Sequence, residues 1–482
     1  MCGIVGVIGK KRAIDSIYPA LIALQHRGQD SAGAATFERA FHMKKGNGLV
    51  TTVFNPKNLE RLRGTMGIGH VRYPTVGPGT AEDAQPFIIT TPYGIALAHN
   101  GNLVNYFDLR KYLIENELHY LNSNCDAEII LNLLSIELMK IGAKQLEPHK
   151  IFRALTKVYG KLMGSFAVVS IIAQKGLLAF RDPYGIKPLV CGQSGTCRCC
   201  ASESVALDLL GCTNVTDVKA GQAIYIDTKG KSYTQQIVKP VKAKKAACVF
   251  EYVYFARPDS IIDGIGVYEA RLRLGEELGK ECRRQGLKPD AVIPVPDTAR
   301  ASAQMVAEVL GVKYREGLIK NRYIHRTFIM PTQQERIEAV RLKLNPIRSE
   351  IQNKKILLVD DSIVRGNTSR EIVGLLREVG VKKVYYASYS PPLRYPCVYG
   401  IDMQTKGEFI ARNKSVKTIQ KHIGADMLVY QTPEGLVRGV GAGDRGFCTA
   451  CFTGTYPTDI PTRLMKRIEA DRRIPKASHC DD

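Results

Sequence analysis

The sequence predicts a two-domain protein of the α/β and α+β classes, with a doubly wound parallel sheet in its C-terminal half. The chain has 482 residues, which is enough for two or three domains with complete cores. Residues 242–247 are polar and basic, as is typical of a join between domains. Residues 355–390 follow the pattern strand, loop, helix, strand, which is the unit of a parallel sheet.

The first strand of that unit leads into a candidate ligand site. Residues 356–359 form a continuous apolar run, as expected of a buried parallel strand, and the run stops at Asp360 and Asp361. A polar loop with Gly366 follows, and apolar residues then recur at helical spacing until Gly380. The loop therefore lies at the carboxyl end of a strand, where open α/β sheets bind ligands. The candidate N-caps of the helix are Asn367, Thr368 and Ser369.

The side chains of this loop indicate a phosphorylated sugar bound with a metal ion. Backbone N–H groups at a helix start, with hydroxyls from Ser362, Thr368 and Ser369, suit a phosphate dianion. Asp360 and Asp361 suit sugar hydroxyls, or an Mg²⁺ ion that bridges sugar and diphosphate. Phosphoribosyl diphosphate (PRPP) combines these features. The alternative is a surface acid pair before an ordinary helix.

Residues 359–368, Val-Asp-Asp-Ser-Ile-Val-Arg-Gly-Asn-Thr, resemble the PRPP-binding motif of type I phosphoribosyltransferases. The resemblance implies PRPP as a substrate and one Mg²⁺ ion per subunit, held by Asp360, Asp361 and Thr298. Thr298 follows a second expected strand at 291–297, and its alternative role is simple capping of the next helix. The implied PRPP-binding residues of the loop are Asp360, Asp361, Ser362, Val364, Arg365, Gly366, Asn367 and Thr368.

A cation-rich segment at residues 320–344 is expected to act as a lid. Its weak periodicity suits a loop that closes over an anionic substrate. The phosphoribosyltransferase resemblance implies such a loop here, usually with a glycine where this chain has His325. Arg322 and Arg326 are expected to contact phosphate.

Composition excludes several classes of protein. The formal net charge is +22, but the excess is spread along the chain with only a modest basic cluster at 463–476. No zinc-finger spacing or RNA-binding aromatic motif accompanies it, so we expect a field that attracts polyphosphate substrates and no specific nucleic-acid partner. No apolar run approaches the ~20 residues of a membrane span. The N-terminus has no basic region of a signal peptide, so a cytoplasmic protein is expected, and its thirteen cysteines are expected as thiols, metal ligands or nucleophiles.

Cys2 is a candidate nucleophile. Removal of the initiator methionine would leave it as the terminal residue, with its own α-amino group, of pKa about 8, as a base within reach. The alternative is a small buried apolar residue. Three polar, glycine-bearing turns follow, at residues 25–33, 67–75 and 98–102. Together with Cys2 they resemble the glutaminase domain of N-terminal-nucleophile (Ntn) amidotransferases over roughly residues 2–228.

That resemblance implies a four-layer αββα fold and a set of roles. Cys2 is the implied nucleophile, Asn100 and Gly101 the oxyanion donors, Arg72 the clamp for the glutamine carboxylate, and Asp126 the partner of its ammonium. The alternatives are a surface salt bridge for Arg72, a turn for Asn100 and Gly101, and a helix cap for Asp126. The further implied glutamine-binding residues are Arg27, His70 and Thr75.

The combination of the two halves resembles one family, the amidophosphoribosyltransferases. Residues 248–260 are unusually aromatic and resemble that family's domain junction. The resemblance implies a glutaminase domain at 2–235, a transferase domain at 248–460 and a basic tail at 461–482. It implies that ammonia from glutamine is channelled to PRPP to form 5-phosphoribosylamine, the first committed step of purine biosynthesis. Purine nucleotides are the implied feedback inhibitors, and a homotetramer is implied by analogy.

Two groups of cysteines remain. One branch of that family binds a [4Fe–4S] cluster through four cysteines, and the matching positions here are Cys248, Cys397, Cys448 and Cys451. A zinc ion on the same thiolates, or free thiols, is the alternative. A second group crowds one region without a histidine or regular spacing, so a hairpin with free thiols is expected there rather than zinc. Its members are Cys191, Cys197, Cys199, Cys200 and Cys212.

Two other classes of function compete with the enzyme. One is a regulatory protein that senses PRPP and glutamine without turnover, and the other is an oxygen or redox sensor built on the cysteines. The nucleophile Cys2, the clamp Arg72 and the complete loop at 359–368 are all present. We therefore expect the enzyme.

Overall fold

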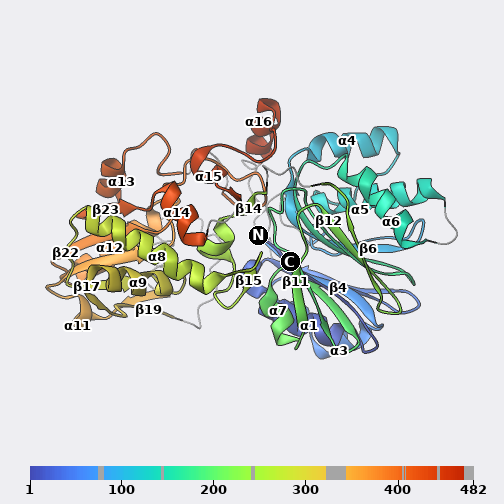
Figure 1. Cartoon of the computed structure of the whole chain (residues 1–482), viewed down its shortest axis with the longest axis horizontal. Helices are drawn as coiled ribbons and strands as arrows, with labels where there is room; N and C mark the ends of the chain where they lie inside the picture. The colour runs from blue at the N-terminus through green and yellow to red at the C-terminus, as the bar shows by residue number, and fades with distance from the viewer. Residues whose placement is uncertain are drawn as a thin grey trace, which may run out of the picture.

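The computed structural model describes residues 1–73, 81–142, 146–239, 245–321, 343–403, 407, 409–441 and 446–471. Two lobes lie side by side, and the N-terminus lies between them (Figure 1). The first lobe carries two stacked antiparallel sheets, and the second carries one parallel sheet. The two-domain α/β and α+β prediction is confirmed.

Within the described residues of the first lobe, seven strands form one sheet and six form the other. The first sheet has the order β11-β9-β10-β1-β4-β2-β3. These strands are β11 (Thr213–Asp217), β9 (Val190–Ser194), β10 (Cys197–Ala201), β1 (Gly3–Ile8), β4 (Met66–Arg72), β2 (Ser31–Phe37) and β3 (Phe41–Asn47). The second sheet has the order β13 (Ser232–Gln236), β12 (Gln222–Asp227), β8 (Gly176–Arg181), β7 (Gly164–Ile172), β6 (Ile95–Leu103) and β5 (Phe87–Ile89).

Helices cover the outer face of each of these sheets, which confirms the predicted four layers. One apolar core, with Ile4 and Val169, fills the space between the sheets, and two more lie under the helices. The first sheet is covered by α1 (Ile14–Ala23), α2 (Val50–Val53), α3 (Pro56–Arg61) and α7 (Ser204–Leu209), near the short η1 (Gln25–Arg27). The second is covered by α4 (Tyr106–Asn116), α5 (Asp126–Ile141) and α6 (Pro148–Tyr159).

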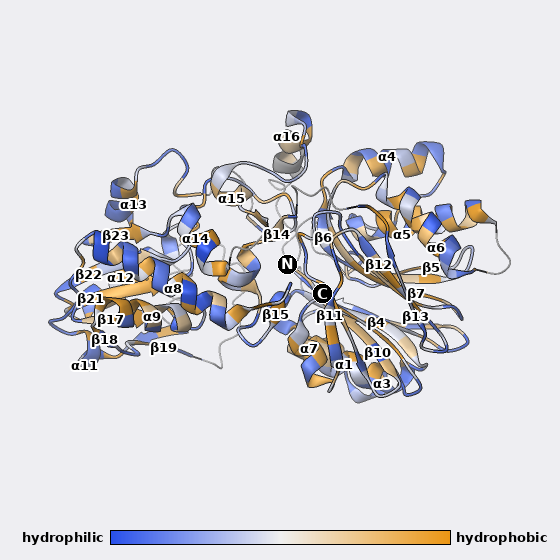
Figure 2. Ribbon diagram, in the orientation of Figure 1, coloured by the Kyte–Doolittle hydropathy of each residue, from blue (hydrophilic) through white to orange (hydrophobic). Residues whose placement is uncertain are grey.

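The second lobe is a doubly wound parallel sheet of order β18-β17-β21-β22-β23. Its strands are β18 (Lys313–Tyr314), β17 (Ala291–Pro294), β21 (Lys355–Asp360), β22 (Lys383–Ser388) and β23 (Met427–Tyr430). Helices α8 (Val267–Arg284), α9 (Arg300–Leu310) and α14 (Pro433–Val440) pack on one face, and α12 (Asn367–Glu378) and α13 (Val416–Ile423) on the other. Apolar residues mark the strands and the inward sides of these helices (Figure 2). The strand predicted to end at Asp360 and Asp361 is β21, and it is buried.

Short elements join the lobes and complete the second one. The junction begins with β14 (Ala247–Cys248), which pairs in parallel with β24 (Phe447–Cys448), and continues into η2 (Glu251–Phe255). A core that includes Met1 and Val104 from the first lobe runs into the junction and the second lobe. The remaining elements are β15 (Ile261–Ile262), β16 (Ile265–Gly266), β19 (Leu318–Lys320), β20 (Leu344–Pro346), α11 (Arg348–Ile351), α15 (Ala450–Thr453) and α16 (Thr462–Asp471).

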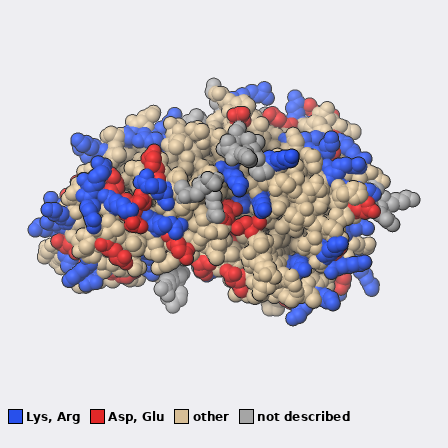
Figure 3. Space-filling model, in the orientation of Figure 1, with Lys and Arg blue, Asp and Glu red and all other residues tan. Residues whose placement is uncertain are grey.

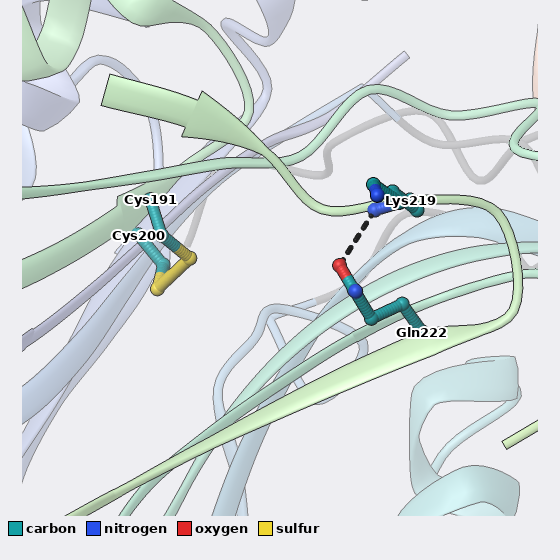
Figure 4. The surroundings of a disulfide bond; sticks show 4 residues. All are labelled: Cys191, Cys200, Lys219 and Gln222. Atoms are coloured by element: carbon teal, nitrogen blue, oxygen red, sulfur yellow. Dashed lines mark hydrogen bonds between the residues drawn. A yellow bond between two sulfur atoms is a disulfide. The ribbon is translucent and has the colours of Figure 1, made fainter. Parts of the chain in front are cut away.

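The cysteine-rich hairpin departs from the prediction. Cys191 and Cys200 face each other across β9 and β10 and form a disulfide, with a Cα–Cα distance of 4.1 Å (Figure 4). The expectation of free thiols is therefore wrong for this pair. The disulfide forms because the register of the two strands places these cysteines directly opposite each other, and opposed residues of an antiparallel pair lie within disulfide reach. Composition alone does not fix that register.

The face of the molecule drawn in Figure 3 carries charges of both signs. Lysines and arginines lie over both lobes with acidic groups among them (Figure 3). Among the described residues, no helix combines the length and the apolarity needed to cross a bilayer.

Candidate functional site

Cys2 is held at the start of β1, between the two sheets and the junction. The residue is 7% exposed. Its backbone N–H donates to Asn100 Oδ1 at 3.1 Å, and its thiol donates to the Tyr73 carbonyl at 3.7 Å. Met1 is also buried, and burial, together with the charges of Lys187 and Arg27, lowers the pKa of the terminal amino group to about 6. The amino group of Met1 is therefore readily neutral at physiological pH.

Arg27 connects Cys2 to the junction between the lobes. Its Nε donates to the Cys2 carbonyl at 2.9 Å. Its guanidinium binds Glu251 of η2 at 2.8 and 3.1 Å and also contacts Glu203. All three side chains are buried. Burial opposes the charge on Arg27, but the two carboxylates outweigh it and raise the pKa of the guanidinium.

Glu203 joins this network to the segment that follows η2. Its carboxylate accepts from His26 Nε2 at 2.8 Å, Ser260 Oγ at 2.7 Å and the Arg257 backbone N–H at 3.0 Å. Burial opposes ionisation of Glu203, but Arg27 and His26 lower its pKa well below the ordinary range. Arg27 therefore orients the backbone of Cys2, and its predicted contact with glutamine stays a prediction.

Asn100 and Gly101 belong to β6 and lie beside Cys2. The Asn100 Oδ1 accepts from Cys2, whereas its buried Nδ2 has no hydrogen-bond partner in the part of the chain that the structure describes. A free, preorganised donor next to a nucleophile is what an oxyanion hole requires. A Cβ on Gly101 would lie 2.0 Å from the Ser165 carbonyl oxygen, so only glycine fits there.

Arg72 lies opposite Cys2, because the register of β1 and β4 pairs Gly3 with Val71. It is 4% exposed, and its guanidinium lies 3.6 Å from Asp83, so a surface salt bridge is excluded. His70, two residues earlier, is fully buried, and neither ring nitrogen has a hydrogen-bond partner among the described residues. Burial and the charge of Arg72 hold its pKa well below the usual range, so the ring is neutral.

Asp126 is the first residue of α5 and reaches back to β6. Its carboxylate accepts from the Leu103 N–H at 2.9 Å and lies 3.3 Å from His99 Nδ1. Burial opposes its ionisation, but His99 and the Leu103 N–H outweigh burial and lower the pKa of Asp126. The N-cap of α5 is Cys125, so Asp126 does not cap the helix. Thr75 lies outside the described residues.

The acid pair of the second lobe lies where the sequence predicted. Asp360 ends β21, and Tyr386 donates to its Oδ2 at 2.5 Å. Ser362 donates to Asp361 at 2.6 Å, and Thr298 also hydrogen-bonds to Asp361. Burial raises the pKa of both acids, and the charge of Asp360 raises that of Asp361 further. Two carboxyls and a hydroxyl in a poorly hydrated place form a favourable donor set for a hard cation.

The loop that follows Asp361 differs from the prediction at the start of α12. The N-cap is Gly366 with φ of 79°, and no side chain caps the helix. Asn367, Thr368 and Ser369 are therefore wrong as caps, because the backbone turns one residue earlier at a conformation that glycine adopts readily. The N–H groups of the first turn are consequently left for a ligand. Val364 and Arg365 precede the turn. Arg322 and Arg326 lie outside the described residues, as do all positions from 322 to 342 of the predicted lid.

A basic cavity of about 300 Å³ adjoins this loop. The cavity is lined by Arg365 and Asn367 of the loop and by Arg412, Lys414 and His422 from the segment before and within α13. No sequence motif marked the last three residues, since they come together only through the fold.

The two lobes meet at the strand that carries Asn100 and Gly101. Asn102 Nδ2 donates to the Val398 carbonyl at 2.9 Å, and Ser165 Oγ donates to the Tyr399 carbonyl at 2.9 Å. A Cβ on Gly400 would lie 2.6 Å from the Gly101 carbonyl oxygen. The backbone of β6 around Gly101 therefore packs directly against the second lobe.

Four cysteines from distant segments line one small, almost wholly apolar cavity at the junction. They are Cys248, Cys397, Cys448 and Cys451, the positions singled out in the sequence. Burial raises the pKa of Cys248 to about 12 and raises the pKa of Cys448 and Cys451 further. Repulsion between the negative charges that these cysteines would carry as thiolates raises each pKa as well. As the side chains stand, no group of three or more His, Cys, Asp or Glu among the described residues has the arrangement of a metal site.

Comparison with known proteins agrees with this geometry. Residues 70–209 match the glutamine amidotransferase domain, and residues 265–389 match the phosphoribosyl transferase domain. The amidophosphoribosyltransferase of Pseudomonas aeruginosa is 48% identical over 98% of this chain and 96% of its own. The enzyme of that name from Escherichia coli is 48% identical over 95% of this chain and 93% of its own. The one from Saccharomyces cerevisiae is 43% identical over 98% of this chain and 95% of its own.

A solved structure of glutamine PRPP amidotransferase from B. subtilis, complexed with ADP and GMP, superposes with a TM-score of 0.85 at 38% identity. The match covers 96% of this chain and 98% of that one. Fold and site thus define a glutamine amidotransferase joined to a phosphoribosyltransferase. The chain belongs to the amidophosphoribosyltransferase family.

We predict that Glu251→Gln weakens both the fold and the glutaminase site. Removing one partner of a buried ion pair costs about 3–5 kcal/mol, and Arg27 would then hold the Cys2 carbonyl less firmly. Urea unfolding and glutamate release by the folded fraction measure the two effects. Glu60→Gln, at an exposed position, is the matched control and should change neither. Unaltered glutamate release in folded Glu251→Gln would contradict the positioning role of Arg27.

We also predict that Asp361→Asn stabilises the protein when PRPP and divalent cations are absent. Because burial raises the folded pKa of this acid pair, the pair favours folding below about pH 4 and loses that contribution as pH rises through the folded pKa. The melting temperature of the variant should exceed that of the wild type by on the order of 2–4 °C at pH 8, with a smaller difference at pH 5. A difference that shrinks as pH rises would refute the assignment.

Proposed function

We propose that this chain catalyses the glutamine-dependent amidation of PRPP to 5-phosphoribosylamine, with release of glutamate and diphosphate. This is the first committed step of purine biosynthesis. The observation that carries the proposal is the joining of two sites in one chain. Cys2 with Asn100 lies in one lobe, Asp360 with Asp361 lies in the other, and the strand that carries Asn100 packs against the second lobe.

Chemistry in the first lobe begins at Cys2. The α-amine of Cys2, which is terminal once Met1 is removed, takes the proton of the thiol. The thiolate then attacks the side-chain amide carbon of glutamine, and the amine passes that proton to the departing ammonia. Asn100 Nδ2 and the Gly101 N–H stabilise the oxyanion, Arg72 binds the α-carboxylate, and Asp126 binds the α-ammonium. His70 and Thr75 complete the proposed glutamine pocket. Water then hydrolyses the thioester and releases glutamate.

Chemistry in the second lobe is displacement at the anomeric carbon of PRPP. The first turn of α12 and the residues from Ser362 to Thr368 hold the 5-phosphate, and Arg322 and Arg326 contact phosphate from the lid. Asp360, Asp361 and Thr298 fit one Mg²⁺ ion, which when bound offsets charge on the diphosphate leaving group. Ammonia attacks the carbon and diphosphate leaves. The close approach of the Gly101 and Gly400 backbones supports a source of ammonia near the boundary with the second lobe, where a route sheltered from water avoids its protonation.

We propose that the junction cysteines hold a [4Fe–4S] cluster. Four thiols line a single enclosed cavity, which suits four thiolate ligands. Lys187 provides independent support. Its side chain is fully buried, and the Met1 thioether, 2.6 Å from Nζ, is the one hydrogen-bond partner found for it among the described residues. Its charge opposes the burial-driven rise in the pKa of Cys248 and Cys448, so it offsets anionic sulfur in that cavity.

Several broader properties belong to the proposal. The boundaries are 2–235 for the glutaminase domain, 248–460 for the transferase domain and 461–482 for the tail. Purine nucleotides are proposed as feedback inhibitors, which the ADP and GMP complex of the B. subtilis relative supports. A homotetramer and a cytoplasmic location stay predictions.

We predict that Cys2→Ala abolishes glutamine-dependent synthesis and retains synthesis from ammonium salts. The reason is that only the first lobe needs the thiol. Diphosphate release with each nitrogen source measures this, and Cys282→Ala, a buried cysteine of α8, is the control. Asp361→Asn should lose both activities. PRPP binding without diphosphate release in the wild-type protein would favour the sensing protein instead.

We predict about four iron and four acid-labile sulfide per chain after anaerobic purification. Lys187→Met removes the charge and leaves a side chain of similar size in the buried position. Because the bound anionic sulfur then loses a nearby cation, the variant should contain less iron and its cluster should have a lower reduction potential. Lys280→Met on the exposed face of α8 is the control. Absence of iron from the wild type, or zinc in its place, would reject the cluster.

A further inference from the structure

The junction turn η2 is held from both lobes. The Ala256 N–H closes the turn by donating to the Glu251 carbonyl at 2.9 Å, and the backbone is extended from Ala256 onward. The carbonyls that follow Glu251 therefore need donors from outside the turn, as at other helix ends. On the side of the first lobe, the Glu251 carboxylate binds Arg27. The turn thus offers a charged side chain to one lobe and backbone acceptors to the other.

An arginine of the second lobe makes three hydrogen bonds to these carbonyls. Arg271 lies on α8 and is 4% exposed. Its Nε donates to the Tyr252 carbonyl at 3.0 Å, and its Nη2 donates to the Tyr254 and Ala256 carbonyls at 3.2 and 2.8 Å. A planar guanidinium presents its donors in a fixed fork, which a lysine ammonium does not. Arg271 therefore fixes the path of the backbone through the turn.

Tyr389 holds a fourth carbonyl and connects η2 to the acid pair. Its side chain is fully buried, and its hydroxyl donates to the Val253 carbonyl at 2.9 Å. The residue directly follows β22, and its backbone N–H donates to the Asp360 carbonyl at 3.1 Å. Arg271 is close enough to the pair for its charge to oppose the burial-driven rise in the pKa of Asp361. Both residues that hold η2 from the second lobe thus lie near the acid pair.

Hydrogen bonds and an ion pair consequently connect the acid pair to the nucleophile. Each contact is between 2.8 and 3.1 Å long, and the side chains of Tyr389, Glu251 and Arg27 are at most 2% exposed. Water therefore does not readily replace a lost partner, and a buried group is left unsatisfied. The connection runs from the Asp360 carbonyl through Tyr389, the Val253 carbonyl, Glu251 and Arg27 to the Cys2 carbonyl.

We propose that Tyr389 and Arg271 are positioning residues for glutamine cleavage, and that they act on Cys2 from the second lobe through η2, Glu251 and Arg27. This role rests on the proposed function, since Cys2 is the nucleophile only in that reaction. Neither residue has to touch glutamine. They set the placement of the Cys2 backbone, and so the rate of attack rather than the binding of glutamine.

Tyr389→Phe tests this role, because it removes one hydroxyl and leaves the Val253 carbonyl buried without its donor. At saturating PRPP and Mg²⁺, kcat for glutamate release per folded chain should fall about fivefold. The KM for glutamine and the rate of diphosphate release with ammonium salts should not change. Tyr225→Phe is the matched control. It removes a buried hydroxyl of β12 that donates to the Lys175 carbonyl at 2.7 Å, and it should change none of these values.

A double-mutant cycle with Glu251→Gln separates positioning from a general loss of stability. If Tyr389 acts through Glu251, the double variant should lose about as much glutamine kcat as Glu251→Gln alone, whereas independent effects multiply. Arg271→Lys adds a second variant. It keeps the charge near Asp361 but loses the fork, so it should lower glutamine kcat more than Tyr389→Phe does while synthesis from ammonium salts persists.

The inference is overturned if Tyr389→Phe keeps the wild-type kcat for glutamine, if Tyr225→Phe lowers that kcat equally, or if the effects of Tyr389→Phe and Glu251→Gln multiply. An equal loss of synthesis from ammonium salts in Tyr389→Phe would also overturn it, because the effect would then lie in the second lobe itself. A wild-type protein that releases no glutamate is a different outcome. It would contradict the proposed function, and the positioning role would fall with it.

Discussion

A buried arginine holds the two halves of this protein in register. Arg27 binds the carbonyl of Cys2 through Nε and two carboxylates through the rest of its guanidinium, one of them Glu251 from the junction. Burying an arginine with two carboxylates is costly, because all three charges lose their hydration. Only good geometry with full hydrogen bonding offsets that loss. The position of the nucleophile is therefore tied to a segment that belongs to the neighbouring lobe. A glutaminase site built this way is complete only when the junction is folded.

Other buried polar groups of the molecule lack a full set of charged or hydrogen-bonding partners among the described residues. The acid pair of Asp360 and Asp361 repels itself, the junction thiols resist ionisation, and the Asn100 amide has an unused donor. Each mismatch lies where the proposed chemistry supplies the missing partner, respectively a cation, the iron ions of a cluster and an oxyanion. Polar groups left this way in a folded protein commonly indicate function.

The sequence predicted the parts of this architecture that local patterns encode. The apolar run before Asp360 became β21, and Arg72 and Asn100 lie beside Cys2 on β4 and β6, one strand from each of the two stacked sheets. The sequence did not predict which acidic residues pair with Arg27. Glu203 and Glu251 are 176 and 224 residues away from it along the chain and belong to no recognisable motif. The disulfide depended on strand register, and the helix start at Gly366 depended on a backbone turn that side-chain preferences do not determine.

The proposed reaction requires that nitrogen released at Cys2 is used at the acid pair without mixing with solvent. Glutamine labelled with ¹⁵N at its side-chain amide, supplied with PRPP, Mg²⁺ and an excess of unlabelled ammonium chloride, tests this directly through the isotope content of the product. Product that retains nearly all of the label is the expected result. Label diluted to the isotope ratio of the bulk ammonia would contradict a sheltered route between the two lobes.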